Sequence, residues 1–114
     1  MSAITTHILD TSLGRPAEGV SIVLEIEMGE DNWEEIGRGV TDKDGRLRTL
    51  ISSDARLHTG VYRINFDVAE YFAKQEKESF YTVISIVFVV RDAAEHYHVP
   101  LLLNPFGYST YRGS

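Results

Sequence analysis

Apolar and polar side chains alternate along residues 20–28, and this is the period of a β-strand rather than of a helix. The odd-numbered positions are mostly polar, whereas the even-numbered positions form an unbroken apolar series. That series consists of Val20, Ile22, Leu24, Ile26 and Met28. We therefore expect a half-buried strand whose even-numbered side chains face a hydrophobic core.

Other stretches rich in β-branched and aromatic residues also have the length and composition of strands. They are residues 4–9, 33–40, 47–51, 61–66, 80–91, 96–103 and 108–111. Turn-forming residues separate them, and residues 29–32 and 104–107 predict two tight turns. Asp44-Gly45 is a hairpin signal, and it would deliver Arg46 to the start of the strand at 47–51.

One segment departs from the strand period. Asp67 is followed three residues later by Glu70, and this is the spacing of a capping box at the start of a helix. The pattern predicts one short helix over residues 67–75, with Lys74 near its end, where a cation interacts favourably with the helix dipole.

About eight strands, one short helix and turns at intervals of about 8–12 residues are typical of a β-sandwich. The sequence therefore predicts an all-β fold built from two sheets. Because 114 residues are few for two separate cores, we expect a single domain over residues 1–114.

The charge balance narrows the range of partners. The formal net charge is -6, whereas a nucleic-acid-binding protein requires a basic surface.

The absence of cysteine excludes disulfides, thiolate metal sites and a cysteine nucleophile. The longest apolar run, residues 83–90, is much shorter than the roughly 20 residues of a transmembrane helix. We expect no membrane association, and we expect a cytoplasmic location because no signal peptide is visible.

Histidines are the main candidates for chemistry, since the imidazole pKa of about 6.5 suits proton transfer near neutral pH. His7 lies within a predicted strand, beside apolar residues. His96 and His98 are two positions apart, so their side chains share one face of a strand. His58 lies in a predicted loop, and we interpret it as a surface residue.

Three segments carry a resemblance to a known family. They are THILDTSLGRPAEGV at residues 6–20, TDKDGR at 41–46 and HYHVPLLLNPFGYSTYRGS at 96–114. These segments resemble the 5-hydroxyisourate hydrolases, the transthyretin-related enzymes of urate breakdown. The closing YRGS is the most specific part, because the hormone-carrier branch of the same fold lacks it.

The resemblance implies a transthyretin-like sandwich that assembles as a homotetramer from two dimers. It also implies hydrolysis of 5-hydroxyisourate to 2-oxo-4-hydroxy-4-carboxy-5-ureidoimidazoline, with no cofactor. The residues that match the catalytic positions of the family are His7, Arg46 and His98. Which histidine is the general base stays open, and His96 is interpreted as a supporting or surface residue.

The tail offers further contacts for the substrate. Tyr111 can close one wall of a pocket, and Arg112 and Ser114 can hold the substrate, a water or a neighbouring subunit. The alternative is that this tail only stabilises the tetramer. We favour a role in the site, because burying an arginine without a partner is costly.

Two other functions compete with hydrolysis, and a metal site is a rival interpretation of the histidines. A carrier could bind a small aromatic ligand in the channel of the same tetramer, and a sandwich domain could serve only protein interaction. His7, His96 and His98 could also form a zinc site. We favour no metal, because a histidine pair alone is a weak signal and Arg46 would repel a cation.

Overall fold

The computed structural model describes residues 3–52 and 56–114. Within these residues it has one helix, α1 (Val68–Ala73), and nine strands. The strands are β1 (Ile4–Asp10), β2 (Arg15–Pro16), β3 (Ser21–Gly29), β4 (Asn32–Val40), β5 (Arg46–Leu47), β6 (Gly60–Asp67), β7 (Val83–Val90), β8 (Tyr97–Asn104) and β9 (Gly107–Thr110). The all-β prediction with one short helix is confirmed, and β2 is a short strand that the sequence pattern did not predict.

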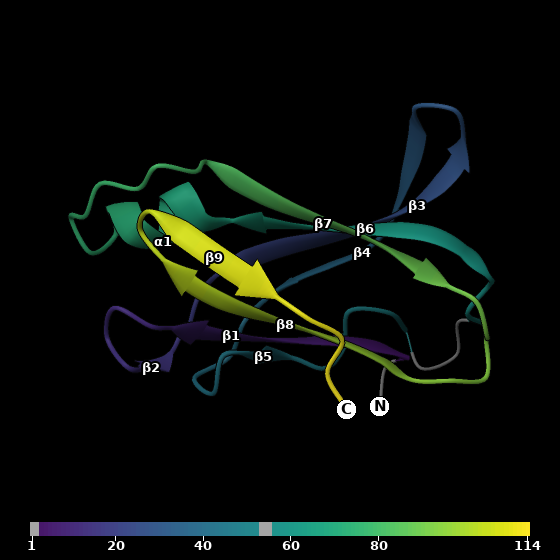
Figure 1. The fold of residues 1–114 in the computed structure, drawn as a ribbon, viewed down its shortest axis with the longest axis horizontal. Coiled ribbons are helices and arrows are strands. Elements are labelled where there is room, and N and C mark those ends of the chain that lie inside the picture. Colours follow the sequence, from purple (N-terminus) through teal and green to yellow (C-terminus); the bar gives the residue numbers. More distant parts are fainter. Residues whose placement is uncertain (1–2, 53–55) are drawn as a thin grey trace.

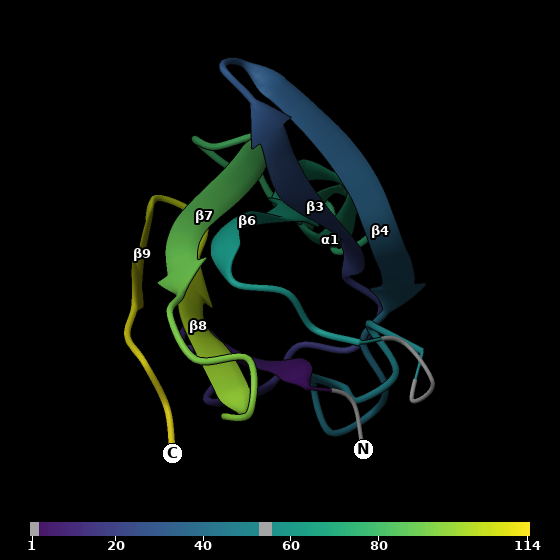
Figure 2. The same ribbon diagram turned by 90° about the vertical axis from the view of Figure 1, so that its right-hand side faces the viewer.

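The strands form two sheets that face each other (Figures 1 and 2). Sheet A has the order β2-β1-β8-β9, with β5 also paired to β1, and sheet B has the order β4-β3-β6-β7. β1 and β8 run parallel, although they come from opposite ends of the chain. This pairing brings the N-terminal and C-terminal segments side by side, and the predicted two-sheet sandwich is confirmed.

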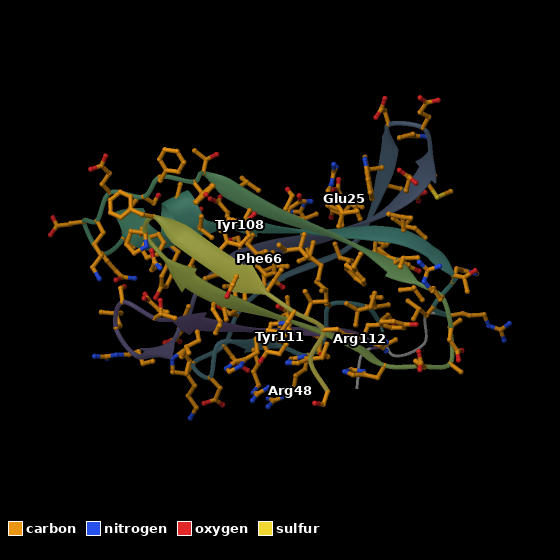
Figure 3. All side chains as sticks on the ribbon, in the orientation of Figure 1. Glu25, Arg48, Phe66, Tyr108, Tyr111 and Arg112 are labelled. Carbon is orange, nitrogen blue, oxygen red and sulfur yellow. The ribbon has the colours of Figure 1, made fainter. Side chains whose placement is uncertain are left out.

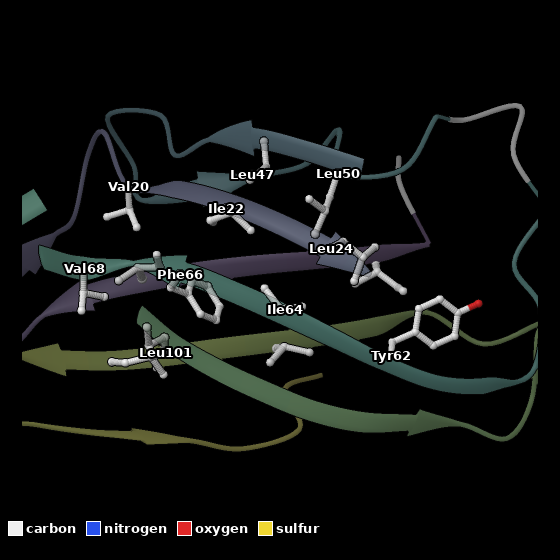
Figure 4. Packing of buried hydrophobic residues seen from close by; sticks show 14 of the residues in the cluster. Val20, Ile22, Leu24, Leu47, Leu50, Tyr62, Ile64, Phe66, Val68 and Leu101 are labelled. Atoms are coloured by element: carbon white, nitrogen blue, oxygen red, sulfur yellow. The ribbon is translucent and has the colours of Figure 1, made fainter. Parts of the chain in front are cut away.

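The alternation along β3 builds one wall of the core. Val20, Ile22 and Leu24 are buried, and they pack with Ile64 and Phe66 of the neighbouring strand (Figure 4). Each such side chain contributes about 1.5–3 kcal/mol when it leaves water. The pattern ends where β3 and β4 form a hairpin that projects from the sandwich (Figure 1), so the last apolar position of the series is exposed.

The N-cap contact of the predicted capping box begins the helix. The Asp67 side chain accepts a hydrogen bond from the backbone N–H of Glu70 at 3.3 Å, a contact of a kind that typically contributes about 1 kcal/mol. α1 is shorter than predicted and ends at Ala73, with Lys74 as its C-cap. Val68 and Phe72 are buried, so the helix anchors the segment between β6 and β7 to the core.

The predicted strand over residues 47–51 is wrong. β5 contains only Arg46 and Leu47, and it pairs with β1 instead of returning along β4. Leu50 and Ile51 are both buried, which a strand with alternating faces does not allow. A Cβ on Gly37 would lie 1.8 Å from the Leu50 carbonyl oxygen, so this segment crosses closely over β4. The turn at residues 42–45 therefore leads the chain from sheet B to sheet A.

The remaining differences lie at the ends of elements. β7 begins at Val83, three residues after the start predicted for that strand. The turn predicted at 104–107 joins β8 to β9, and Asn104 pairs with Gly107. In the described part of the chain, no helix is long and apolar enough to cross a membrane.

Candidate active site

Three neighbouring strands of sheet A bring the predicted catalytic residues together. His7 of β1 lies opposite Arg46 of β5 in the antiparallel register. Thr5, two residues before His7 and on the same face of β1, lies opposite His98 of β8 in the parallel register. Ile4 and Ile8 point into the core, so Thr5 and His7 lie on the outer face of the sheet.

The turn before β5 fixes the position of Arg46. Asp42 Oδ1 accepts hydrogen bonds from the backbone N–H groups of Asp44 and Arg46, at 2.9 and 3.0 Å. Gly45 has a φ of 73°, and a Cβ there would lie 2.4 Å from the Ile8 carbonyl oxygen. Ile8 in turn donates its N–H to the Gly45 carbonyl at 2.8 Å. Glycine is therefore required at this position, since it lets the turn approach β1 beside His7.

A polar cleft of about 220 Å³ opens on this face. Two predicted catalytic residues, Arg46 and His98, line it together with Ser114 from the tail. The other lining residues are Thr5, Thr6, Arg48 and His96. His7 does not line the cleft but lies beside it, opposite Arg46.

His98 is held both at its ring and at its backbone. The Thr5 hydroxyl lies 2.9 Å from His98 Nδ1 and 2.9 Å from His96 Nε2. The backbone carbonyl of His98 accepts a hydrogen bond from Gly113 N–H at 2.8 Å, and the two residues form an isolated antiparallel bridge. His96 is therefore connected to His98 through Thr5.

Both candidate catalytic histidines favour the neutral state. Burial lowers the pKa of His7 below 6.5, and the positive charge of Arg46 lowers it further. Burial also lowers the pKa of His98, followed by the charges of Arg46, His7 and His96. A neutral imidazole retains a lone pair that can accept a proton, so both residues are suited to act as bases near neutral pH.

Tyr111 and Arg112 lie in a different cavity from Ser114. They line a groove of about 520 Å³ between the end of β7 and strands β8 and β9, and His98 borders this groove as well as the polar cleft. Figure 3 shows Tyr111 and Arg112 along the segment that follows β9. Arg112 lies 3.4 Å from Glu95 and stacks 4.6 Å above the Tyr97 ring, so its charge already has partners within the chain.

No three His, Cys, Asp or Glu side chains are grouped to hold a metal ion in residues 3–52 and 56–114. His7, His96 and His98 accordingly do not form such a group. His96 and His98 instead share the Thr5 hydroxyl.

Sequence reasoning missed three residues of the cleft, Thr5, Thr6 and Arg48. Thr5 precedes His7 by two residues and Arg48 follows Arg46 by two, so a strand period alone would place each on the face of its predicted neighbour. Thr5 gives no signal by itself, because threonine is common in strands. Only the pairing of β1 with β8 brings its hydroxyl to His98.

Comparison with known proteins identifies the family. Residues 4–113 match the sequence profile of the HIUase/Transthyretin family. A probable 5-hydroxyisourate hydrolase of Caenorhabditis elegans is 45% identical over 113 residues, which cover 99% of this chain and 82% of that protein.

Two solved structures share the fold. The 5-hydroxyisourate hydrolase of Klebsiella pneumoniae has a TM-score of 0.84 and 40% identity, with 97% of this chain and 92% of that chain covered. Sea bream transthyretin in complex with thyroxine has a TM-score of 0.91 and 33% identity. The match covers 98% of this chain and 95% of that chain. The chain belongs to the HIUase/Transthyretin family.

Proposed function

We propose that this chain is a hydrolase that opens the ring of 5-hydroxyisourate to give 2-oxo-4-hydroxy-4-carboxy-5-ureidoimidazoline in urate degradation. The observation that carries the proposal is the arrangement of His7, Arg46 and His98 on one face of sheet A, with the pKa of both histidines lowered by burial and by Arg46. Relatives named 5-hydroxyisourate hydrolase, similar over nearly the whole chain, support the same reaction.

The reaction is the transfer of an acyl group to water. The water oxygen adds to a ring carbonyl carbon, the carbonyl becomes a tetrahedral oxyanion, and the adjacent C–N bond then breaks. The water loses a proton and the leaving nitrogen gains one, so that the product carries a new carboxylate. These steps require a base, a positive charge near the oxyanion and a proton donor.

His7 and His98 supply the proton transfers in this proposal. Neutral imidazole takes the proton of the attacking water, and imidazolium delivers a proton to the leaving nitrogen. Arg46 binds the polar edge of the substrate and stabilises the oxyanion, because its guanidinium is always charged and can donate two parallel hydrogen bonds. Water attacks directly, since no Gly-x-Ser-x-Gly nucleophile motif occurs in the sequence.

The tail residues would bind substrate from two directions. Ser114 lines the polar cleft beside Arg46 and His98, and can donate a hydrogen bond to the bound molecule. Tyr111 and Arg112 border the adjoining groove, which meets the cleft at His98. Arg112 can turn toward a substrate only by leaving Glu95, an exposed contact that is weak enough to exchange.

A homotetramer built from two dimers of this single domain would complete the site. β7 and β9 are edge strands of the two sheets, and edge strands tend to pair with other chains. Exposed apolar side chains on or beside them, such as Val87 and Phe106, support an interface there. Sedimentation should then give four times the mass of one chain.

The second candidate function is that of a carrier. The high TM-score to sea bream transthyretin in complex with thyroxine concerns the fold, which both functions share. The two functions differ in the chemistry of the cleft. Two histidines with lowered pKa beside Arg46 suit proton transfer and an anionic intermediate, whereas an aromatic ligand is held mainly by apolar walls.

The test is the decay of freshly generated 5-hydroxyisourate, followed by ultraviolet absorbance with and without the protein near pH 7.5. We expect a large acceleration over spontaneous hydrolysis, lost in His98→Ala and retained in His58→Ala, a histidine outside the cleft. A folded wild-type protein without acceleration would overturn the proposal. Tight binding of thyroxine in equilibrium dialysis would then favour the carrier.

A further inference from the structure

The Thr5 hydroxyl lies between two imidazoles, His98 on one side and His96 on the other. The distances are 2.9 Å to His98 Nδ1 and 2.9 Å to His96 Nε2, so both are of hydrogen-bond length. Thr5 is 6% exposed and stands opposite His98 in the parallel register of β1 and β8. The backbone therefore holds the hydroxyl in place between the two rings.

One hydroxyl has a single proton to donate, so it cannot donate to both rings at once. If Thr5 donates to His98 Nδ1, then neutral His98 carries its proton on Nε2. If Thr5 instead donates to His96 Nε2, then His98 Nδ1–H donates to the hydroxyl oxygen, and the lone pair of His98 lies on Nε2. The tautomer of His98 therefore depends on whether His96 Nε2 accepts the hydrogen bond of the Thr5 hydroxyl.

We propose that Thr5 is a positioning residue that holds neutral His98 as the Nδ1–H tautomer, by accepting from His98 and donating to His96. This inference rests on the proposed function only for its kinetic consequence. Nε2 of His98 is then the nitrogen that exchanges protons with substrate and water. His96 takes part as the acceptor that orients the Thr5 hydroxyl.

The hydrogen-bonding capacity of the ring favours this direction. Protonated His98 carries N–H on both ring nitrogens, so its Nδ1 must donate to the Thr5 hydroxyl, and only the Nδ1–H tautomer of neutral His98 keeps that hydrogen bond unchanged. The Thr5 backbone also raises the pKa of His98, in agreement with a ring that donates toward Thr5. Within the described residues, the ring of His98 has no other hydrogen-bond partner than Thr5. Nε2 is accordingly available for the reaction.

The arrangement serves both protonation states of His98. When Nε2 takes a proton from water, Nδ1–H continues to donate to Thr5, and the hydroxyl does not need to rotate. Other titratable and charged groups surround the same ring: Arg46 and Arg48 in the cleft, Arg91, Glu95 and Arg112 in the groove, and His7 on β1. The charges of Arg46, His7 and His96 lower the pKa of His98. The hydrogen bonds of Thr5 with His98 and His96 determine which ring nitrogen of His98 carries the proton.

The test is ¹⁵N NMR of the imidazole nitrogens at a pH where His98 is neutral, a measurement that needs no substrate. We expect the Nδ1–H tautomer of His98 in the wild type, and a shift toward Nε2–H in Thr5→Val. His96→Ala should cause the same shift although His96 does not touch His98, because Thr5 is then free to donate to His98. His58→Ala, at another exposed histidine, should change nothing. An Nε2–H tautomer in the wild type, or an unchanged tautomer in His96→Ala, would refute the proposal.

Kinetics provide a second measurement. We expect kcat to fall roughly 10- to 100-fold in Thr5→Val with KM little changed, and Thr5→Ser to restore most of the rate. Thr41→Val is the matched control, since it removes a buried threonine hydroxyl that bonds only to the backbone of Ala17 and Val20. Its expected effect is on stability and not on the tautomer of His98.

Equal losses of kcat in the Thr5 and Thr41 variants, with an unchanged tautomer of His98, would contradict a positioning role for Thr5. If the wild type shows the Nδ1–H tautomer of His98 but does not hydrolyse 5-hydroxyisourate, the proposed function is refuted and the positioning role of Thr5 is not.

Discussion

Gly113 donates its backbone N–H to the carbonyl oxygen of His98 at 2.8 Å, and a Cβ built on Gly113 would lie 2.6 Å from Cδ2 of the same histidine. The C-terminal segment is therefore docked against the strand that carries a proposed catalytic group. The contact is so close that only glycine fits without displacing the ring. The segment at Gly113 is thus held against β8 by a backbone hydrogen bond and is not frayed.

Replacing Gly113 by alanine should therefore damage the site more than the fold. The added methyl group must displace either the His98 ring or the tail, and we expect kcat/KM to fall about tenfold or more. Thermal unfolding should change little, because Gly113 makes few contacts outside the site. Gly29→Ala is the control, since a Cβ there has no neighbour within 4 Å. An unchanged kcat/KM in Gly113→Ala would show that the position of the tail does not matter for the reaction.

The pH profile of kcat/KM reports the base of the free enzyme. Burial and then Arg46 lower the pKa of both His7 and His98 below 6.5, so each is more than half neutral at pH 6.5. We expect kcat/KM to decline on acidification with a midpoint below pH 6.5. A decline centred above pH 6.5 would contradict the assignment of either histidine as the base.

Arg46 should influence both histidines through its charge. Its removal in Arg46→Ala takes away the second-largest cause of the lowered pKa in each, after burial. We therefore expect NMR titration to show a higher pKa for both His7 and His98, and Arg46→Lys to keep most of the shift because it retains the charge. A pKa of His98 that is the same in the wild type and Arg46→Ala would place the guanidinium too far away to act.

Asp10 and Tyr71 connect the end of β1 to the helix. Asp10 is fully buried, and burial alone would raise its pKa, but hydrogen bonds from Ser12, Tyr71 and Leu13 outweigh burial and lower it. The Tyr71 hydroxyl donates to Asp10 at 2.7 Å, and burial together with this contact raises the pKa of Tyr71 to about 12. The ionised carboxylate therefore stabilises the fold above the unfolded pKa of 3.8, and this contribution is lost as the pH falls below that value.

Tyr71→Phe should lower the free energy of unfolding by about 1–3 kcal/mol at pH 7, because a buried carboxylate loses one of its donors. Urea unfolding measures this loss, and the acid transition should also move to higher pH. Tyr108→Phe is a suitable control, since Tyr108 is exposed and its ring contacts Tyr81. Equal stability of the two variants would mean that the Asp10–Tyr71 contact contributes little.

Most of the fold could be predicted because local signals agree with the packing. The alternation of β3, the N-cap residue Asp67 and the turn at residues 104–107 each appear in the structure where the pattern placed them. The failure at residues 47–51 has a physical cause. Leu50 and Ile51 are both buried because the chain crosses between the sheets there, and this long-range packing has no local period.

Only some of the site residues could be predicted from the sequence. His98 could be named from its motif, but the cleft depends on the parallel pairing of β1 with β8, which brings residues 93 positions apart into contact. Thr5 was missed for this reason. Tyr111 and Arg112 were expected beside Ser114, whereas the structure places them in the adjoining groove.

In the proposed function, His7, Arg46 and His98 together hydrolyse 5-hydroxyisourate. The most direct measurement compares the rate of 5-hydroxyisourate decay in the wild type and in Arg46→Ala, after circular dichroism has shown that both are folded alike. We expect the wild type to accelerate the decay strongly. In Arg46→Ala the catalysed rate should fall about 10²- to 10³-fold, which is the usual effect of removing a group that stabilises an oxyanion. Full activity in a correctly folded Arg46→Ala protein would contradict the account.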